Sequence, residues 1–234
     1  MPFIPRLLLC LSLLLSVAGR CQETLRFRQW IGGQETGGLE LRSTNEGPRR
    51  RLETREWLRL ERLGLVVEQE VRQTLWRDPT GEIQVQWTLK LAQEPMEGEA
   101  DWSPGSPRQL NLKPKGMPSQ AIQLPEQTLL WPEDADALMR AAAASRSPLF
   151  LRGYVIPMQQ PSSLELECKG PSPLPGFSDA VRFKGRSQEG PITSEVEVWI
   201  SPTRGELRHQ GKIMGMDFLL QRAELPAPGT LPQA

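Results

Sequence analysis

The stretch Ile83–Leu91, which reads Ile-Gln-Val-Gln-Trp-Thr-Leu-Lys-Leu, has an apolar side chain at every second position. A period of two places all the apolar side chains on one face of an extended strand and the polar ones on the other. The stretch is therefore predicted to be a half-buried β-strand. An antiparallel sheet that packs one face on a core and leaves the other in water is the architecture that needs this pattern.

Neighbouring segments repeat this pattern between strong turn signals, so residues 22–131 are predicted to form antiparallel strands. Asp78-Pro79-Thr80-Gly81 predicts a turn directly before the strand, because proline presets φ and glycine accepts the left-handed region. Trp30-Ile31 leads into a glycine-rich run over residues 32–38, and alternation resumes at Leu39–Arg42. We expect a hairpin here, with residues 32–38 as its turn.

Prolines interrupt residues 92–131, at positions 95, 104, 107, 114, 118 and 125. Because proline has no N–H for a central ladder, only short edge strands are expected, near residues 109–113 and 121–124. A helix is then predicted from Pro132 to about Ser145, since acids follow its first residue and an alanine run has high helix propensity. Leu138, Ala141 and Ala142 are expected to form its packed stripe.

Alternating segments return after the helix. They cover residues 149–156, 164–168, 181–183, 196–200, 207–213 and 214–220. The predicted fold is mainly β: a curved antiparallel sheet, an open half-barrel, with one helix packed on its concave side. Residues 22–225 are expected to form a single domain, and the proline-rich residues 226–234 a disordered tail.

The N-terminus predicts export. Arg6 precedes the apolar run Leu7–Leu15, which is too short for a comfortable membrane span, and Ser16-Val17-Ala18 supplies the small residues that a signal peptidase reads. Residues 1–18 are therefore predicted to be a signal peptide, and the mature chain is expected to lack a transmembrane span and to be periplasmic or secreted. An uncleaved anchor and a lipoprotein anchored at Cys21 remain alternatives, although Arg20 fits a lipobox badly.

The cysteine content and the charge balance limit the functions that this chain is expected to have. Cys21 and Cys168 remain after cleavage, and export permits them to pair, but two unpaired thiols are favoured, because Cys168 continues an apolar face. Lys+Arg 28 against Asp+Glu 28 argues against nucleic-acid binding. With one His and no phosphate-loop or calcium-loop spacing, the chain is expected to bind no metal and no cofactor and not to be an enzyme.

Several turn-and-strand segments resemble the exported β-rich region that precedes the catalytic core of bacterial transglutaminase-like proteins, and related periplasmic domains of unknown function. They are residues 30–38, Arg62–Glu68, Asp78–Ile83 and Val198–Leu207. Leu39 stands where that family usually has an aromatic residue. The Cys–His–Asp core that follows in the family is absent from this chain, so the resemblance implies a β-rich fold and assigns no catalytic role to Cys168 or His209.

Three hypotheses follow for function. The first is a non-catalytic exported binding or scaffold module that offers a sheet edge or its concave face to a protein partner. The alternative is a periplasmic carrier of lipid or another apolar ligand, by analogy of fold. Its groove would be lined by Trp87, Leu89, Leu138, Met139, Val198 and Ile200. The third, an enzyme, would need convergent titratable groups in a cleft, and no such set is evident.

Overall fold

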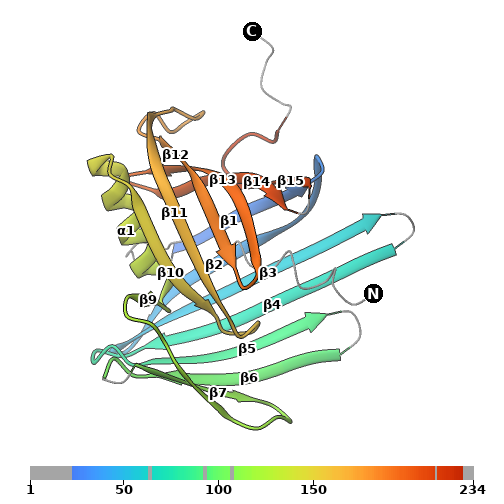
Figure 1. Cartoon of the computed structure of the whole chain (residues 1–234), viewed down its shortest axis with the longest axis vertical. Helices are drawn as coiled ribbons and strands as arrows, with labels where there is room; N and C mark the ends of the chain where they lie inside the picture. The colour runs from blue at the N-terminus through green and yellow to red at the C-terminus, as the bar shows by residue number, and fades with distance from the viewer. Residues whose placement is uncertain (1–22, 63–64, 92–93, 106–107, 214, 229–234) are drawn as a thin grey trace.

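The computed structural model describes residues 23–62, 65–91, 94–105, 108–213 and 215–228. The predicted signal peptide and Cys21 lie outside these residues, as do residues 229–234 of the predicted tail. The described chain forms one curved sheet of 15 strands with a single helix, α1 (Pro132–Ser145) (Figure 1). The predicted fold class, mainly β with an open curved antiparallel sheet and one helix on its concave side, is confirmed.

Two meanders build the sheet. The N-terminal arm contains β1 (Glu23–Ile31), β2 (Gln34–Glu46), β3 (Arg49–Arg62), β4 (Leu65–Arg77), β5 (Ile83–Leu91), β6 (Glu94–Trp102), β7 (Gln109–Pro114) and β8 (Gln120–Gln123). The C-terminal arm contains β9 (Thr128–Leu129), β10 (Leu149–Val155), β11 (Gln160–Pro171), β12 (Val181–Glu189), β13 (Ile192–Ser201), β14 (Gly205–Ile213) and β15 (Met216–Arg222).

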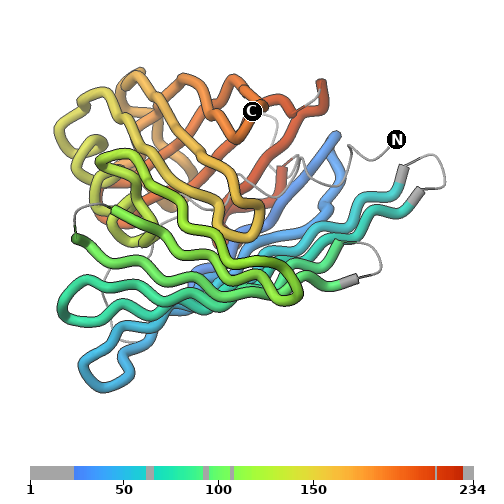
Figure 2. Tube along the Cα trace, turned by 60° about the horizontal axis from the view of Figure 1, so that its bottom comes forward, coloured from blue at the N-terminus to red at the C-terminus, as the bar shows by residue number. Residues whose placement is uncertain are grey.

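The two arms are joined by the pairing of the first and last strands of the described chain. β1 pairs with β15 antiparallel, with Phe27 opposite Arg222 and Ile31 opposite Phe218. The sheet edges are therefore β8 and β9, which follow each other in the chain and do not pair. The sheet consequently curls around an interior and stays open between these two edges (Figure 2).

The concave side holds the core and the helix. α1 contacts β9, β10, β13 and β14. Its buried apolar stripe is Ala135, Met139, Ala142 and Ala143, which recur at the spacing of one helical face. The predicted stripe of Leu138, Ala141 and Ala142 was wrong in two members, because Leu138 and Ala141 point away from the sheet and are exposed.

The start of the helix also ties the two arms together. Glu133 in its first turn forms an ion pair with Arg50 of β3 at 2.8 Å, and Asp134 forms one with Arg77 of β4 at 2.8 Å. The acids predicted to suit the positive end of the helix dipole therefore also anchor α1 to the N-terminal arm.

Two local predictions need correction. The turn of the first hairpin consists of Gly32 and Gly33 alone, whereas Gly37 and Gly38 lie inside β2, where Trp57 of β3 crowds the space that a Cβ would take. Residues 94–102 form the strand β6, which the prolines argued against. Pro95 is tolerated because β7 pairs only with Gly98–Trp102, so no ladder on that side needs its missing N–H.

Candidate functional site

The six residues predicted to line an apolar groove do not come together as one surface. Met139, Val198 and Ile200 are fully buried in a core that α1 shares with the C-terminal arm. Trp87 and Leu89 are buried in a separate core of the N-terminal arm. Leu138 is 46% exposed on the outer side of α1. Of the six, Trp87 lines a described cavity, and the contact of these residues with a ligand stays a prediction.

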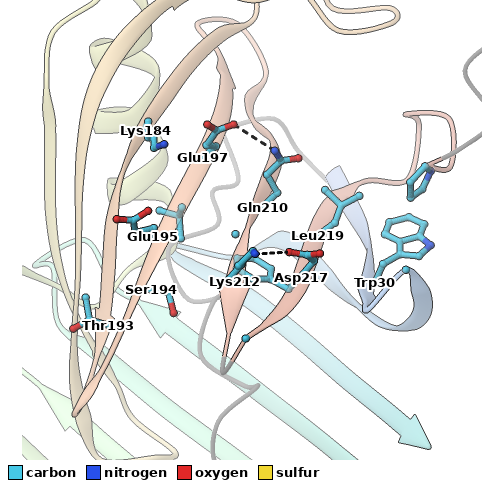
Figure 3. A pocket seen from close by; sticks show the side chains of 16 residues that line it. Trp30, Lys184, Thr193, Ser194, Glu195, Glu197, Gln210, Lys212, Asp217 and Leu219 are labelled. Carbon is cyan, nitrogen blue, oxygen red and sulfur yellow. Dashed lines mark hydrogen bonds and ion pairs between the residues drawn. The ribbon is translucent and has the colours of Figure 1, made fainter. Parts of the chain in front are cut away.

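A groove lies on the other face of the C-terminal arm. It is a groove of about 840 Å³ over β12–β15, and it ends at Trp30 of β1. In Figure 3 α1 stands behind the strands that carry the groove, so the groove lies on the face opposite the helix. Gly211, Leu219 and Trp30 supply uncharged surface along it.

Strand register places the polar side chains of the groove in rows. Lys184, Glu197, Gln210 and Leu219 lie directly opposite one another on β12, β13, β14 and β15, and Trp30 continues the row on β1. With strands about 4.8 Å apart, this row crosses about 19 Å of sheet. The groove therefore crosses five strands and is not confined to one hairpin.

Opposite charges alternate along the groove. Gln210 Nε2 donates to Glu197 Oε2 at 3.4 Å (Figure 3). Lys212 Nζ lies 3.9 Å from Asp217 Oδ1, and the side chains of Lys212 and Asp217 are 72% and 79% exposed. Ion pairs this exposed contribute little to stability, so their side chains can turn toward a partner at small cost.

The C-terminal strap, residues 223–228, fixes one end of the groove. The Arg28 guanidinium lies 5.2 Å from the Trp30 ring centre, and its Nη2 donates to the Leu225 carbonyl at 2.7 Å. Gln221 Nε2 donates to the Pro226 carbonyl at 2.9 Å, and Pro228 then lines the groove. Pro226, which was predicted to begin a disordered tail, is therefore held against the sheet.

The thiol and imidazole that could have suggested catalysis lie apart. Register runs from Cys168 through Phe183 and Val198 to His209, so the two residues are three strands, about 14 Å, from each other. His209 Nδ1 instead lies 3.3 Å from Glu206 Oε1, with both side chains buried. Within the described ranges no group of three or more His, Cys, Asp or Glu side chains could hold a metal ion.

Sequence reasoning missed the groove residues. The signal was present, because Glu195 and Glu197 on one strand, and Gln210 and Lys212 on the next, share a face at spacing two. One strand's sequence does not contain the register between strands. This register places Lys184 opposite Glu197, and Asp217 opposite Lys212.

Comparison with known proteins supports the fold. No protein-family model matches the chain, and no curated protein matches it either. The chain is similar to the crystal structure of a β-barrel-like protein of the domain of unknown function DUF1849 from Brucella abortus, with a TM-score of 0.62 and 10% sequence identity. The match covers 89% of this chain and 98% of that chain.

This likeness supports a β-rich domain with a barrel-like sheet. At 10% identity it speaks for the fold alone. The resemblance to transglutaminase-like proteins stays a prediction. In the part of the chain that the structure describes, no helix has the length and apolar character needed to cross a membrane.

Proposed function

We propose that this protein is a non-catalytic, exported binding module that holds an extended segment of a protein partner in the groove over β12–β15. The observation that carries the proposal is the composition of this groove. An uncharged floor at Gly211 and Leu219 is bordered by alternating charges, Lys184, Glu195 and Lys212 among them. Apolar contact surface inside a polar rim is the usual anatomy of a protein interface.

A polypeptide suits this surface better than a small molecule does. Small-molecule sites enclose most of the ligand and present a few convergent polar groups. Here acidic and basic side chains are spread along about 19 Å of sheet, and Lys212 and Asp217 remain largely in solvent. An extended segment presents donors and acceptors at a regular spacing, so it can use such rows.

Two further observations support a role without catalysis. His209 is buried beside Glu206 and is not among the residues that line the groove, and Cys168 lies three strands from His209. The resemblance to the region that adjoins transglutaminase-like cores fits a module that acts beside another protein. The signal-like residues 1–18 are the basis for proposing that it works outside the cytoplasm.

Site-specific photo-crosslinking in the native host tests the proposal. A photo-crosslinking amino acid is placed at Gln210 in the groove and, as a matched control, at Gln84, an exposed glutamine on the polar face of β5. We expect a discrete crosslinked polypeptide from position 210 that is absent from position 84. An equal pattern from both positions would overturn the proposal.

Charge reversal supplies a second arm. Lys212→Glu should lower the yield of the crosslinked product about fivefold or more, because a like charge would then face Asp217 and the partner would lose a cation. Lys90→Glu is the matched control, since Lys90 Nζ also lies 3.9 Å from its acidic neighbour, Glu70, and is exposed on the other arm. If both reversals left the yield unchanged, the groove would not be the binding surface.

A further inference from the structure

The charges on the outer face of the C-terminal arm are sorted by strand. β12 presents the cations Lys184 and Arg186, and the next strand, β13, presents the anions Glu195 and Glu197 (Figure 3). The members of each pair are two residues apart, so both point to the same face of the sheet. Register sets Lys184 opposite Glu197, and Arg186 opposite Glu195. The hairpin of β12 and β13 therefore carries a basic stripe beside an acidic stripe.

The strands on both sides of this hairpin continue the alternation. Glu165 of β11 lies opposite Arg186. On the other side, Lys212 of β14 extends the row that contains Glu195. One row across the sheet consequently reads acid, base, acid, base, from β11 to β14.

The charges of the hairpin are not paired with one another. Lys184, Arg186 and Glu195 are exposed, and none of them forms an ion pair with a residue of the described ranges. Glu197 accepts a hydrogen bond at 3.4 Å from Gln210, which is uncharged. The two stripes therefore keep their charges in solvent, where an approaching molecule can reach them.

The outer face of the N-terminal arm is different. There, opposite charges on neighbouring strands contact each other directly. Arg26 Nη2 of β1 lies 3.1 Å from Glu40 Oε1 of β2, and Arg55 Nε of β3 lies 2.7 Å from Glu70 Oε1 of β4. Uncommitted charges in register are thus a feature of the hairpin and not of the whole sheet.

A two-fold axis between β12 and β13 converts this pattern into its own complement. Rotation about an axis parallel to the strands places β12 of one copy over β13 of a second copy. Lys184 then faces Glu197 of the second copy, and Arg186 faces Glu195 of the second copy, because each residue meets its own cross-strand neighbour. Two-fold dimers are the commonest assemblies of identical chains.

The next pair of strands favours the same axis. The rotation also brings Glu165 of one copy over Lys212 of the other, so three pairs of opposite charge form, each of them twice. An axis between β13 and β14 would instead place Lys184 over Leu219 and leave it without an anion. The charges therefore fit a second copy best when the axis runs along the hairpin of β12 and β13.

We propose that a second copy of this chain docks on this outer face, with the basic stripe of each copy over the acidic stripe of the other. The inference rests on the proposed function, because it names the partner: strands β10–β13 of the second copy lie over the groove of β12–β15. Facing sheets are about 10 Å apart, a distance that lysine, arginine and glutamate side chains can bridge together. A contact made chiefly by charges is weak and sensitive to salt.

Sedimentation equilibrium of the full mature chain measures the dimer directly. We expect a monomer–dimer equilibrium at low salt. Its dissociation constant should rise about tenfold or more between roughly 0.05 and 0.5 M NaCl, because salt screens exposed charges. A chain that stays monomeric at low salt up to millimolar concentration would overturn the proposal.

Reversal of one stripe at a time tests which charges face each other. The double variant Lys184→Glu, Arg186→Glu makes both stripes acidic, and Glu195→Lys, Glu197→Lys makes both basic. Each variant alone should dimerise at least about tenfold more weakly, since like charges then meet across the contact. An equimolar mixture of the two should dimerise again, which also shows that both variants are folded. A mixture that does not associate would contradict the proposed pairing.

A matched control keeps the change in net charge but moves it to the other arm. Lys113→Glu, Lys115→Glu also reverses two exposed cations that are two residues apart, at the end of β7. This variant should dimerise like the parent chain. An equal loss in the control and in the β12 variant would mean that net charge governs association, and the stripes would then not be the docking surface.

Photo-crosslinking from Gln210 separates the failure of this inference from the failure of the proposed function. In the proposed dimer, Gln210 faces Glu167 of the second copy. The crosslinked product should therefore contain two copies of this chain, joined from position 210 to β11 near Glu167. A product with a different polypeptide would overturn the self-docking inference and leave the proposed function intact. Absence of any product would overturn both.

Discussion

His209 Nδ1 lies 3.3 Å from Glu206 Oε1, and both side chains, which belong to β14, are buried. A bulge at Trp199 and Ile200 shifts the register of β13 against β14. This shift lets two residues that are three apart on one strand share a face, which regular alternation forbids. The bulge thus places both members of a polar pair on the buried face of β14.

This pair gives the first prediction. His209→Ala should lower the free energy of unfolding by about 2–3 kcal/mol, because it leaves the buried Glu206 without its partner. Urea unfolding at neutral pH measures the change. In a double-mutant cycle with Glu206→Ala, the two losses should overlap by about 1 kcal/mol or more. Strictly additive losses would show that the two side chains do not interact.

Asp179 gives the second prediction, since it holds the turn between β13 and β14. Ser201 Oγ and Thr203 Oγ1 donate to Asp179 Oδ2 at 2.6 and 2.8 Å. Burial raises the pKa of the Asp179 carboxyl, but these hydrogen bonds outweigh it and hold the pKa below the usual 3.8. Asp179→Ala should therefore cost about 1–2 kcal/mol at neutral pH.

The pH dependence of that cost follows from the sign of the shift. A carboxyl with a lowered pKa stabilises the fold above its unfolded pKa and loses this contribution as pH falls through its folded value. The difference between the parent chain and Asp179→Ala should therefore shrink in acid, when urea unfolding is repeated below the usual carboxyl pKa of 3.8. Asp217→Ala, on an exposed carboxylate, should stay within about 0.5 kcal/mol. A difference that is constant with pH would exclude the hydrogen-bonded carboxylate as its cause.

The parts of the fold that could be predicted are those that local pattern decides. Ile83–Leu91 alternates because one face of β5 is buried, and the helix begins at Pro132 because proline suits a first turn. The order of strands was not predictable in the same way. The contact of β1 with β15 joins the two ends of the described chain, and no local signal specifies it. Leu138 was misplaced because an alanine run leaves the direction of the buried face weakly defined.

The site was harder to predict for the same reason. Trp87 was correctly singled out as large and inward-facing, but the residue whose missing side chain leaves room for its indole is Gly98, eleven positions later on the paired strand. Likewise, Glu197 and Lys212 read as ordinary solvated residues until register sets them in one groove. Functional surfaces on a sheet depend on pairings between strands, and one-strand periodicity does not contain them.

Gly37 gives the third prediction. A Cβ there would overlap the backbone carbonyl of Trp57 on β3, which cannot move without separating the strands. Gly37→Ala should therefore destabilise the chain by about 2 kcal/mol or more, measured by urea unfolding. Gly105→Ala is the matched control, since nothing lies within 4 Å of its added Cβ, and it should change stability by less than about 0.5 kcal/mol. Equal effects of the two substitutions would show that the close approach of β2 and β3 at Gly37 is not a constraint.

Glu189, near the end of β12, gives the last prediction. Burial raises the pKa of its carboxyl to about 8, and its Oε1 has no partner among the described residues. The folded chain therefore keeps the proton over a pH range in which the unfolded chain has released it. Stability should fall as pH rises from near 4.5 to about 8, by at most about 1.4 kcal/mol per pH unit.

Glu189→Gln should remove this slope, because glutamine stays neutral at every pH. The variant and the parent chain should be about equally stable near the unfolded carboxyl pKa of 4.5, and the variant should be the more stable one above pH 8. Unfolding in urea across this range measures the difference. Glu195→Gln changes an exposed carboxylate on the neighbouring strand, so its stability should depend on pH in the same way as that of the parent chain. If the stability of Glu189→Gln changed with pH as that of the parent chain does, Glu189 would be ionised in the folded protein.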